Sequence, residues 1–297
     1  MTQTDASGRG WGVVAGDRTR PEESRVGAAP PVRVDLVHSE QDARAAVSVL
    51  AEVWPRVDGK EPLPPELAWV FAHSGNYVAL ARQGDAVVGA AIGFRGEDEH
   101  GALLHSHITG VLPDRQGLGV GYQLKQHQRA WALARGLDRI TWTFDPLVAR
   151  NAYFNVVKLG AQLTHYYVDF YGPMDDGING GDETDRCLVT WRIDSARARA
   201  AAAGSFTVTD VDAVRAAGAT EVLCPNASGA PVVVASTGDL RLVQVPRDVV
   251  DVRHHDAELA RSWRVALREV LVAAFADGLE VIGVGRGSWY VVGRPTP

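Results

Sequence analysis

Cysteine is scarce in this sequence, because the 297 residues include only Cys187 and Cys224. Two cysteines are too few for a disulfide framework or for a zinc site built from cysteine ligands. We therefore interpret both as ordinary thiols of a reducing compartment, and we expect a cytoplasmic protein.

Long apolar segments are missing as well. No apolar run approaches the ~18 residues that identify a membrane-spanning helix. The first 30 residues lack the apolar segment of a secretory signal, and they are rich in glycine, serine, proline and charge. Because this composition is typical of disorder, we expect a disordered leader at residues 1–30 and no membrane partner.

An excess of positive charge is also absent. The formal net charge is −6 and the isoelectric point is near 5.8, whereas sequence-independent binding of nucleic acid requires a basic surface. Only three of the 30 basic residues are lysine, namely Lys60, Lys125 and Lys158. We therefore expect no nucleic-acid partner. Separately, we expect a small-molecule substrate and a chain that acts as a monomer or homodimer.

The hydrophobic patterns predict an α/β domain of the α+β type over residues 31–194. Ser39 is a helix N-cap, and Pro55 ends the helix that follows it. Gln83-Gly84-Asp85 predicts a hairpin turn. The expected elements are a strand at 32–37, helices at 40–54 and within 62–75, two strands within 77–96, then strand 103–111, helix 119–135, strand 139–144, helix 145–160 and strands 161–172 and 187–193. This order predicts a mixed, mostly antiparallel sheet flanked by helices.

A second, smaller α/β domain is expected at residues 205–297. The low-complexity stretch at 195–204 is interpreted as a linker or short helical spacer. Strand-like segments surround Val232, Leu242 and Val281, and the strongest helix pattern runs from Ala257 to Asp277. Because such a unit is small, we expect it to pack on the first domain.

A glycine-rich turn connects the predicted strand 103–111 to the helix that follows it. Its sequence is Gln116-Gly-Leu-Gly-Val-Gly121. Such a turn binds phosphate through amide N–H groups and the positive end of the helix dipole. The spacing matches neither the dinucleotide fingerprint nor the Walker sequence, and a tight turn with no ligand is the alternative.

The motif Gln116-x-x-Gly119-x-Gly121 resembles the Q/R-x-x-G-x-G/A motif of the GNAT superfamily of acyl-CoA-dependent N-acyltransferases. The later stretch NAYFNVVKLGA is similar to the second signature of that family at Ala152, Lys158 and Gly160. The resemblance covers roughly residues 32–193 and implies a GNAT-like fold, in a predicted subgroup with a C-terminal extension. It also implies acetyl-CoA or another acyl-CoA as co-substrate, but it identifies the cofactor class better than the reaction. We expect transfer of the acyl group to a small-molecule amine, and no metal. The residues implied to bind the cofactor are Thr109, Gly110, Val111, Gln116, Gly117, Leu118, Gly119, Val120, Gly121, Tyr122 and Asn151.

Two histidines precede this turn on the predicted strand. Strict strand alternation places His105, His107 and Thr109 on one face. Several GNAT members carry a glutamate at the position of His105, where it deprotonates the amine, and imidazole suits that task. Structural histidines are the alternative, and no third ligand argues for zinc.

The expected general acid is missing from the second signature. Many GNAT members carry a tyrosine that protonates the CoA thiolate, and this chain has Val156 there. Tyr153 is one candidate substitute, and Tyr166 or Tyr167 is another; packing roles are the alternative. Asp145 at the end of strand 139–144 is a further candidate, to orient a histidine or contact substrate, unless it caps the next helix.

Polar residues follow the first domain's strands at 172–186, where Asp175, Asp176, Asp182 and Asp185 lie in a segment interpreted as a solvated loop or a lid. Arg261, Arg264 and Arg268 share one face of the C-terminal helix, as a solvated face or as a site for a substrate carboxylate.

Acyl transfer is the leading hypothesis. A GNAT-fold lyase or decarboxylase is one alternative because the acid is missing. A non-catalytic CoA-binding module is the other.

Overall fold

The computed structural model describes residues 30–56, 59–172 and 182–295. The described residues from Pro31 onward form one compact unit. The expected leader, apart from Pro30, lies outside the described residues, as do Asp175 and Asp176. No helix in these described ranges is both long and apolar enough to cross a membrane.

The first seven strands follow the predicted order closely. Ser39 caps α1 by accepting a hydrogen bond from the Asp42 amide, as the capping pattern predicts. The tight turn at Gly84, which has a φ of 61°, joins β2 to β3 at the predicted hairpin. The elements are β1 (Val32–Leu36), α1 (Glu40–Val53), α2 (Pro65–His73), β2 (Tyr77–Gln83), β3 (Ala86–Asp98), β4 (Gly101–Val111), the 3₁₀ turn η1 (Pro113–Arg115), α3 (Val120–Leu133), β5 (Arg139–Phe144), α4 (Ala149–Tyr153), η2 (Phe154–Lys158), β6 (Gln162–Tyr167) and β7 (Arg186–Arg192).

The helix predicted at 145–160 is shorter and changes type midway. It begins at Ala149, and its second half, η2, is a π-helix. A π-helical segment inside a helix is uncommon and often lies at a functional site.

The C-terminal region adds strands that the sequence pattern did not predict. These are β8 and β12, and the short helices α6 and α7 were also missed. The elements are α5 (Ala196–Ala202), α6 (Val211–Ala216), β8 (Thr220–Pro225), β9 (Pro231–Val233), β10 (Arg241–Gln244), α7 (Val249–His255), α8 (Ala257–Ala276), β11 (Glu280–Gly285) and β12 (Trp289–Gly293). The helix expected at 257–277 is α8, with Asp256 as its N-cap and Gly278 just beyond its end.

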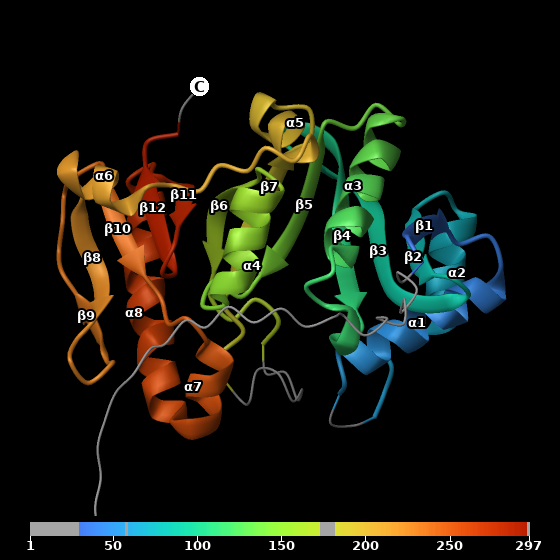
Figure 1. Ribbon diagram of the computed structural model, residues 1–297, viewed down its shortest axis with the longest axis horizontal. Coiled ribbons are helices and arrows are strands. Elements are labelled where there is room, and N and C mark those ends of the chain that lie inside the picture. The colour runs from blue at the N-terminus through green and yellow to red at the C-terminus, as the bar shows by residue number, and fades with distance from the viewer. Residues whose placement is uncertain (1–29, 57–58, 173–181, 296–297) are drawn as a thin grey trace, which may run out of the picture. The chain divides into compact units, whose positions relative to one another are not determined.

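All strands of the described residues belong to one mixed, mostly antiparallel sheet, which confirms the predicted fold class. Their order is β1-β2-β3-β4-β5-β7-β6-β11-β12-β10-β8-β9. Figure 1 shows β1 and β9 at opposite ends of this row of strands. The C-terminal strands join the others where Val281 of β11 pairs with Leu163 of β6.

Helices cover the sheet on both faces. The core on one face contains buried side chains of α3, α4, α5 and α8, including Leu124, Trp263 and Leu267. The core on the other face contains Ala46, Leu50 and further residues of α1 and α2, packed on β2 and β3. These two faces, called the α3 face and the α1 face below, carry different parts of the candidate site.

Candidate functional site

Strands β4 and β5 separate from each other partway along their length. They are parallel, and they pair only at Leu104 with Ile140 and at His105 with Thr141. β4 then continues to Val111 and β5 to Phe144 without further pairing between them. Figure 1 shows these two strands diverging toward their carboxyl ends. We call this opening the β4–β5 fork, and its vertex is the His105–Thr141 pair.

A β-bulge interrupts β4 at the vertex. Ile92 of β3 pairs with Ile108, and Phe94 pairs with His105. One residue of β3 therefore lies opposite two residues of β4, Ser106 and His107, and an extra residue of this kind changes which way the following side chains point.

The bulge corrects the prediction that Thr109 shares a face with the two histidines. Thr109 pairs with Ala91, which belongs to the core on the α3 face, and paired residues of a sheet point to the same face. His105 and His107 instead lie beside the ring of Phe94, at centroid distances of 5.2 and 6.1 Å. Phe94 in turn lies beside Phe71 of α2, on the α1 face.

His105 is held at the vertex by its pairing strand. Its Nδ1 lies 3.2 Å from Oγ1 of Thr141. Burial, with the nearby His107 and Lys125 as further causes, lowers the pKa of His105 to about 4. Burial also lowers the pKa of His107, although that side chain is more exposed. Both imidazoles are therefore neutral near pH 7, which is the form that accepts a proton.

The glycine turn begins at η1 and ends at the first turn of α3. Gly117 and Gly119 have φ values of 78° and 84°, which glycine adopts without a steric penalty. Gln116 stabilises the turn by donating from Nε2 to the carbonyl oxygen of Val111. α3 has no side-chain cap, so its first amide groups are oriented toward any ligand at this turn.

The other residues expected to bind cofactor have varied surroundings. Leu118 is 61% exposed at the tip of the turn, and Val120 is buried. A Cβ at Gly110 would lie 3.1 Å from Leu50 and Val53, so its backbone closely approaches α1. Tyr122 donates to the carbonyl oxygen of Ala201 in α5, and Asn151 is half-buried on α4.

A buried polar cluster that the sequence did not reveal lies on the α3 face of the vertex. Lys125 Nζ donates to Oγ of Ser106 at 2.8 Å and to Oε1 of Gln128 at 3.2 Å, and it lies 3.9 Å from the Trp142 ring centroid. Lys125, Gln128 and Ser106 are 5%, 0% and 3% exposed. Lys125 and Gln128 lie on the buried side of α3, which the apolar pattern had assigned to Val120, Leu124 and Trp131. A lysine beside this apolar stripe was the one sequence signal that could have indicated a buried polar cluster.

Asp145 forms an ion-pair cluster with the C-terminal region. Its carboxylate accepts two hydrogen bonds from Arg264 and one from Arg253 of α7, and it also accepts from the amide of Leu147. Burial opposes ionisation, but these two guanidinium groups hold the pKa of Asp145 well below its usual range. Because its carboxylate is fully occupied by these contacts, we do not include Asp145 among the proposed catalytic residues.

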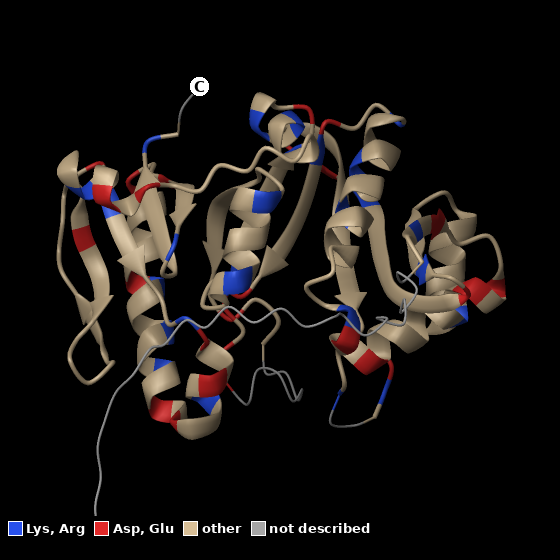
Figure 2. Cartoon of the chain, in the orientation of Figure 1, with Lys and Arg blue, Asp and Glu red and all other residues tan. Residues whose placement is uncertain are grey.

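The described end of the polar loop is anchored rather than solvated. Asp182 accepts from Arg264 and Arg253, while Arg268 donates to Asp185 and Glu183. Figure 2 shows charged residues of both signs on α7 and the adjoining part of α8. The arginines expected to bind a substrate carboxylate thus bind carboxylates of the chain itself, and Arg261 is exposed.

The tyrosines proposed as acids lie in different places. Val156 is fully buried in the core and has no proton to give. Tyr153 is half-buried on α4, against the core of the α3 face. Tyr167 stacks beside His165 and lies 5.1 Å from Phe170, on β6, two strands away from β5. Tyr171, which the sequence reading did not select, reaches β5 itself, with its hydroxyl 3.2 Å from Oγ1 of Thr143.

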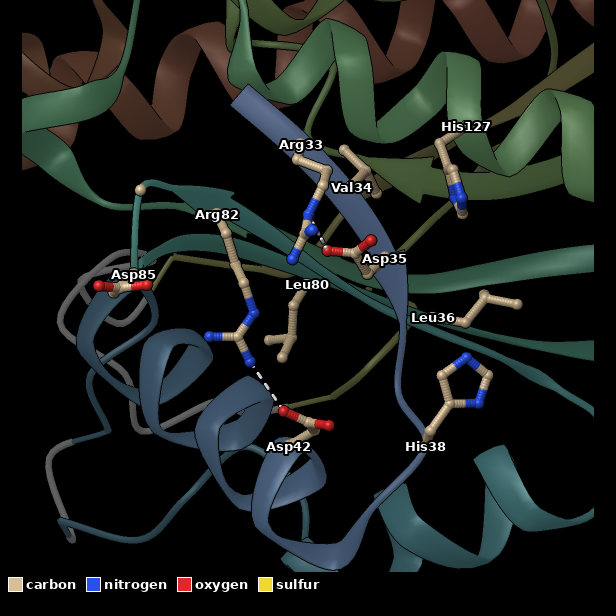
Figure 3. Close-up of a pocket in the computed structure, with 11 residues that line it drawn as sticks. Arg33, Val34, Asp35, Leu36, His38, Asp42, Leu80, Arg82, Asp85 and His127 are labelled. Carbon is tan, nitrogen blue, oxygen red and sulfur yellow. Dashed lines mark hydrogen bonds and ion pairs between the residues drawn. The ribbon is translucent and has the colours of Figure 1, made fainter. Parts of the chain in front are cut away.

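A separate pocket of about 750 Å³ lies beside β1, away from the fork. Figure 3 shows its charged side chains facing one another, with Arg82 paired to Asp42 and Arg33 to Asp35. Its walls include no residue of β4, β5 or the glycine turn. The pocket is therefore not part of the candidate site at the vertex.

Comparison with known proteins connects this geometry to one family. Residues 43–155 match the model of the acetyltransferase (GNAT) family. Among solved structures, the chain is similar to Naa50 of Arabidopsis thaliana in complex with a bisubstrate analogue, at 18% identity over 54% of this chain and 97% of that one, with a TM-score of 0.42. It is also similar to an acetyltransferase of the GNAT family from Streptococcus pneumoniae (16%, 54% and 98%, TM-score 0.43). A third similar structure is the ribosomal-protein-S18-alanine N-acetyltransferase of Escherichia coli (15%, 56% and 96%, TM-score 0.43). No curated protein matches the chain.

Proposed function

We propose that this chain, whose residues 43–155 match the model of the acetyltransferase (GNAT) family, transfers an acyl group from acyl-CoA to the amine of a small molecule. The observation that carries this proposal is the alignment of the fork, the histidines and the glycine turn along β4. We also propose a cytoplasmic location. The proposal keeps two domains, at residues 31–194 and 205–297, and a linker at 195–204 that contains α5.

The glycine turn is the proposed site of the CoA pyrophosphate. The positive φ of Gly117 and Gly119 and the open space around both α-carbons allow a ligand to approach the backbone closely. The uncapped first turn of α3 supplies N–H donors and the positive end of the helix dipole. The pantetheine arm then runs along the unpaired edge of β4 from Val111 toward the vertex.

The proposed base is His105, with His107 as the nearby alternative. The acceptor amine approaches from the α1 face, where both rings lie beside Phe94. His105 takes the amine proton, directly or through water, while unpaired amide groups of β4 in the fork polarise the thioester carbonyl. Nitrogen then attacks the carbonyl carbon, the carbon–sulfur bond breaks, and the CoA thiolate leaves.

Calorimetric titration tests this function at its first step. The protein is titrated with CoA, acetyl-CoA and longer acyl-CoAs, and an amine panel is then assayed for release of free thiol. We expect saturable binding and acceptor-dependent thiol release. Absence of binding by every CoA at millimolar concentration contradicts the proposal.

Decarboxylation of an acyl-CoA is a second candidate, favoured by the burial of Val156 where an acid is expected. Loss of CO₂ from a malonyl thioester breaks a carbon–carbon bond and leaves an enolate, which takes one proton from water at carbon to give the acetyl thioester. The carbon–sulfur bond is not broken, so no proton is needed at sulfur. Malonyl-CoA incubated without an acceptor tests it. Unchanged malonyl-CoA after long incubation excludes this reaction.

A further inference from the structure

Buried charges in the described part of the chain are paired, with one exception. Arg139 pairs with Asp98, Arg241 with Asp277 and Arg264 with Asp145, at 2.6 to 2.8 Å. Asp185 pairs with Arg268. For Lys125, no described carboxylate lies within ion-pair distance, and its hydrogen-bond partners are the neutral Ser106 and Gln128.

An unpaired buried ammonium is unfavourable. The cost is removed if the ammonium binds an anion or if it loses its proton and becomes a neutral amine. Burial lowers the pKa of Lys125 to about 7, so the amine is poised between its two forms in the absence of a ligand. A bound anion restores the charged form. The two hydrogen bonds use two of the three N–H groups of the ammonium. Besides them, Nζ contacts only the Trp142 ring among the described residues, so one N–H can be donated to the oxygen of such a ligand.

The position of Lys125 specifies where that anion lies. Ser106 and Trp142 are the first residues of β4 and β5 beyond the vertex pair, and Nζ contacts both side chains. The amine therefore lies at the inner end of the fork. The glycine turn lies at the other end, beyond Val111. An acyl-CoA that binds with its pyrophosphate at the glycine turn and its pantetheine arm along β4 places the far end of its acyl group at Lys125.

We propose that Lys125 binds a carboxylate at the far end of the acyl group, so that the preferred donor is a CoA thioester of a dicarboxylic acid. This inference rests on the proposed function, because it requires the acyl-CoA to lie in the fork. It differs from the sequence-based expectation that an arginine of α8 binds a substrate carboxylate, since Arg264 and Arg268 are already paired.

Paired acyl-CoAs of equal length test the inference. Succinyl-CoA and butyryl-CoA differ in a terminal carboxylate against a methyl group, and malonyl-CoA and propionyl-CoA differ in the same way. Calorimetry at pH 6.5 should show the carboxylated member of each pair binding about tenfold or more tightly. Lys125→Met should abolish that ratio while it leaves the affinity for butyryl-CoA within about threefold.

Lys60→Met is the matched control, because Lys60 is exposed and loses the same charge. It should retain the wild-type ratio. Equal affinity for succinyl-CoA and butyryl-CoA in the wild-type protein, or an unchanged ratio in Lys125→Met, overturns the inference. Such results leave the proposed function intact as long as free CoA and butyryl-CoA bind, whereas failure of every CoA to bind removes both.

Discussion

Asp145 and Arg264 are 119 residues apart in the sequence and form a two-point ion pair, with Nη1 2.6 Å from Oδ1 and Nη2 2.8 Å from Oδ2. Arg264 is fully buried and Asp145 is 9% exposed. The pair joins the end of β5, beside the fork, to the middle of α8. The geometry of the fork therefore depends on the C-terminal region.

Arg264→Met is expected to destabilise the protein strongly. Removal of one partner leaves the carboxylates of Asp145 and Asp182 buried with less compensation, which costs about 3–5 kcal/mol for a buried pair. Urea unfolding followed by circular dichroism measures the change. Arg261→Met is the control, since that side chain is exposed, and it should change the free energy of unfolding by less than about 0.5 kcal/mol. Equal effects of the two variants would show that the buried pair is not a major source of stability.

Gly119→Ala should weaken CoA binding, whereas Gly136→Ala should not. Both glycines flank α3, have φ values of 84° and 70°, and have open space around the α-carbon. Each alanine therefore strains the backbone by about 1–2 kcal/mol. Only the methyl group that Gly119→Ala introduces lies in the proposed pyrophosphate site. Calorimetry should show a loss of affinity of about tenfold or more for Gly119→Ala alone. Equal affinities in the two variants argue against a pyrophosphate at this turn.

His105→Gln should lower kcat by about 10²–10⁴-fold with little change in CoA affinity. A base must be deprotonated to act, so kcat/KM falls as pH decreases through its pKa. Because the pKa of His105 is lowered to about 4, the wild-type acidic limb should lie well below 6.5. A pH profile of kcat/KM for the wild type, His105→Gln and His107→Gln checks this. A loss confined to His107→Gln assigns the base to His107, and full activity in both variants removes the histidines from the mechanism.

The stability of Lys125→Met relative to wild type should depend on pH. The pKa of Lys125 is about 7 when folded and about 10.4 when unfolded, so unfolding takes up a proton between these values. Wild-type stability from this group consequently rises with pH over that window. His105 is the titratable neighbour, and it is already neutral there. Urea unfolding at pH 7 and pH 10 should favour the variant more at pH 7. If the difference in free energy of unfolding between variant and wild type is the same at both pH values, the pKa of Lys125 is not lowered in the folded protein.

Local signals in the sequence predicted much of the fold. The Ser39 cap, the hairpin at Gly84 and the glycine turn before α3 are each fixed by neighbouring residues, so a single sequence reveals them. The side of β4 on which Thr109 lies was predicted wrongly, because the bulge arises from pairing with β3 rather than from the residues of β4 alone.

Long-range pairs were out of reach for a related reason. Nothing in the segment around Asp145 indicates a partner in α8, and Arg264 looked like one member of an exposed arginine face. Lys125 was overlooked because the amphipathic pattern of α3 is complete without it. Its meaning depends on Ser106 and Trp142, which the fork brings to the same place.

The single backbone pairing between Val281 and Leu163 has a consequence for how the sheet comes apart. Amide groups of a central strand are protected from hydrogen exchange when the strand is hydrogen-bonded to neighbours on both sides. Between β6 and β11 only one residue pair is formed, so few amides are protected there. Cohesion across this line therefore depends on side-chain contacts. They include the arginine–aspartate pairs of α8, the hydrogen bond from Tyr290 to the carbonyl oxygen of Pro146 and the shared apolar core. Because the arginines hold the pKa of Asp145 well below its usual range, mild acid leaves this contact ionised. Arg264→Met should instead open the sheet at this line before either group of strands unfolds, and slow-exchanging amides should then form two separate sets.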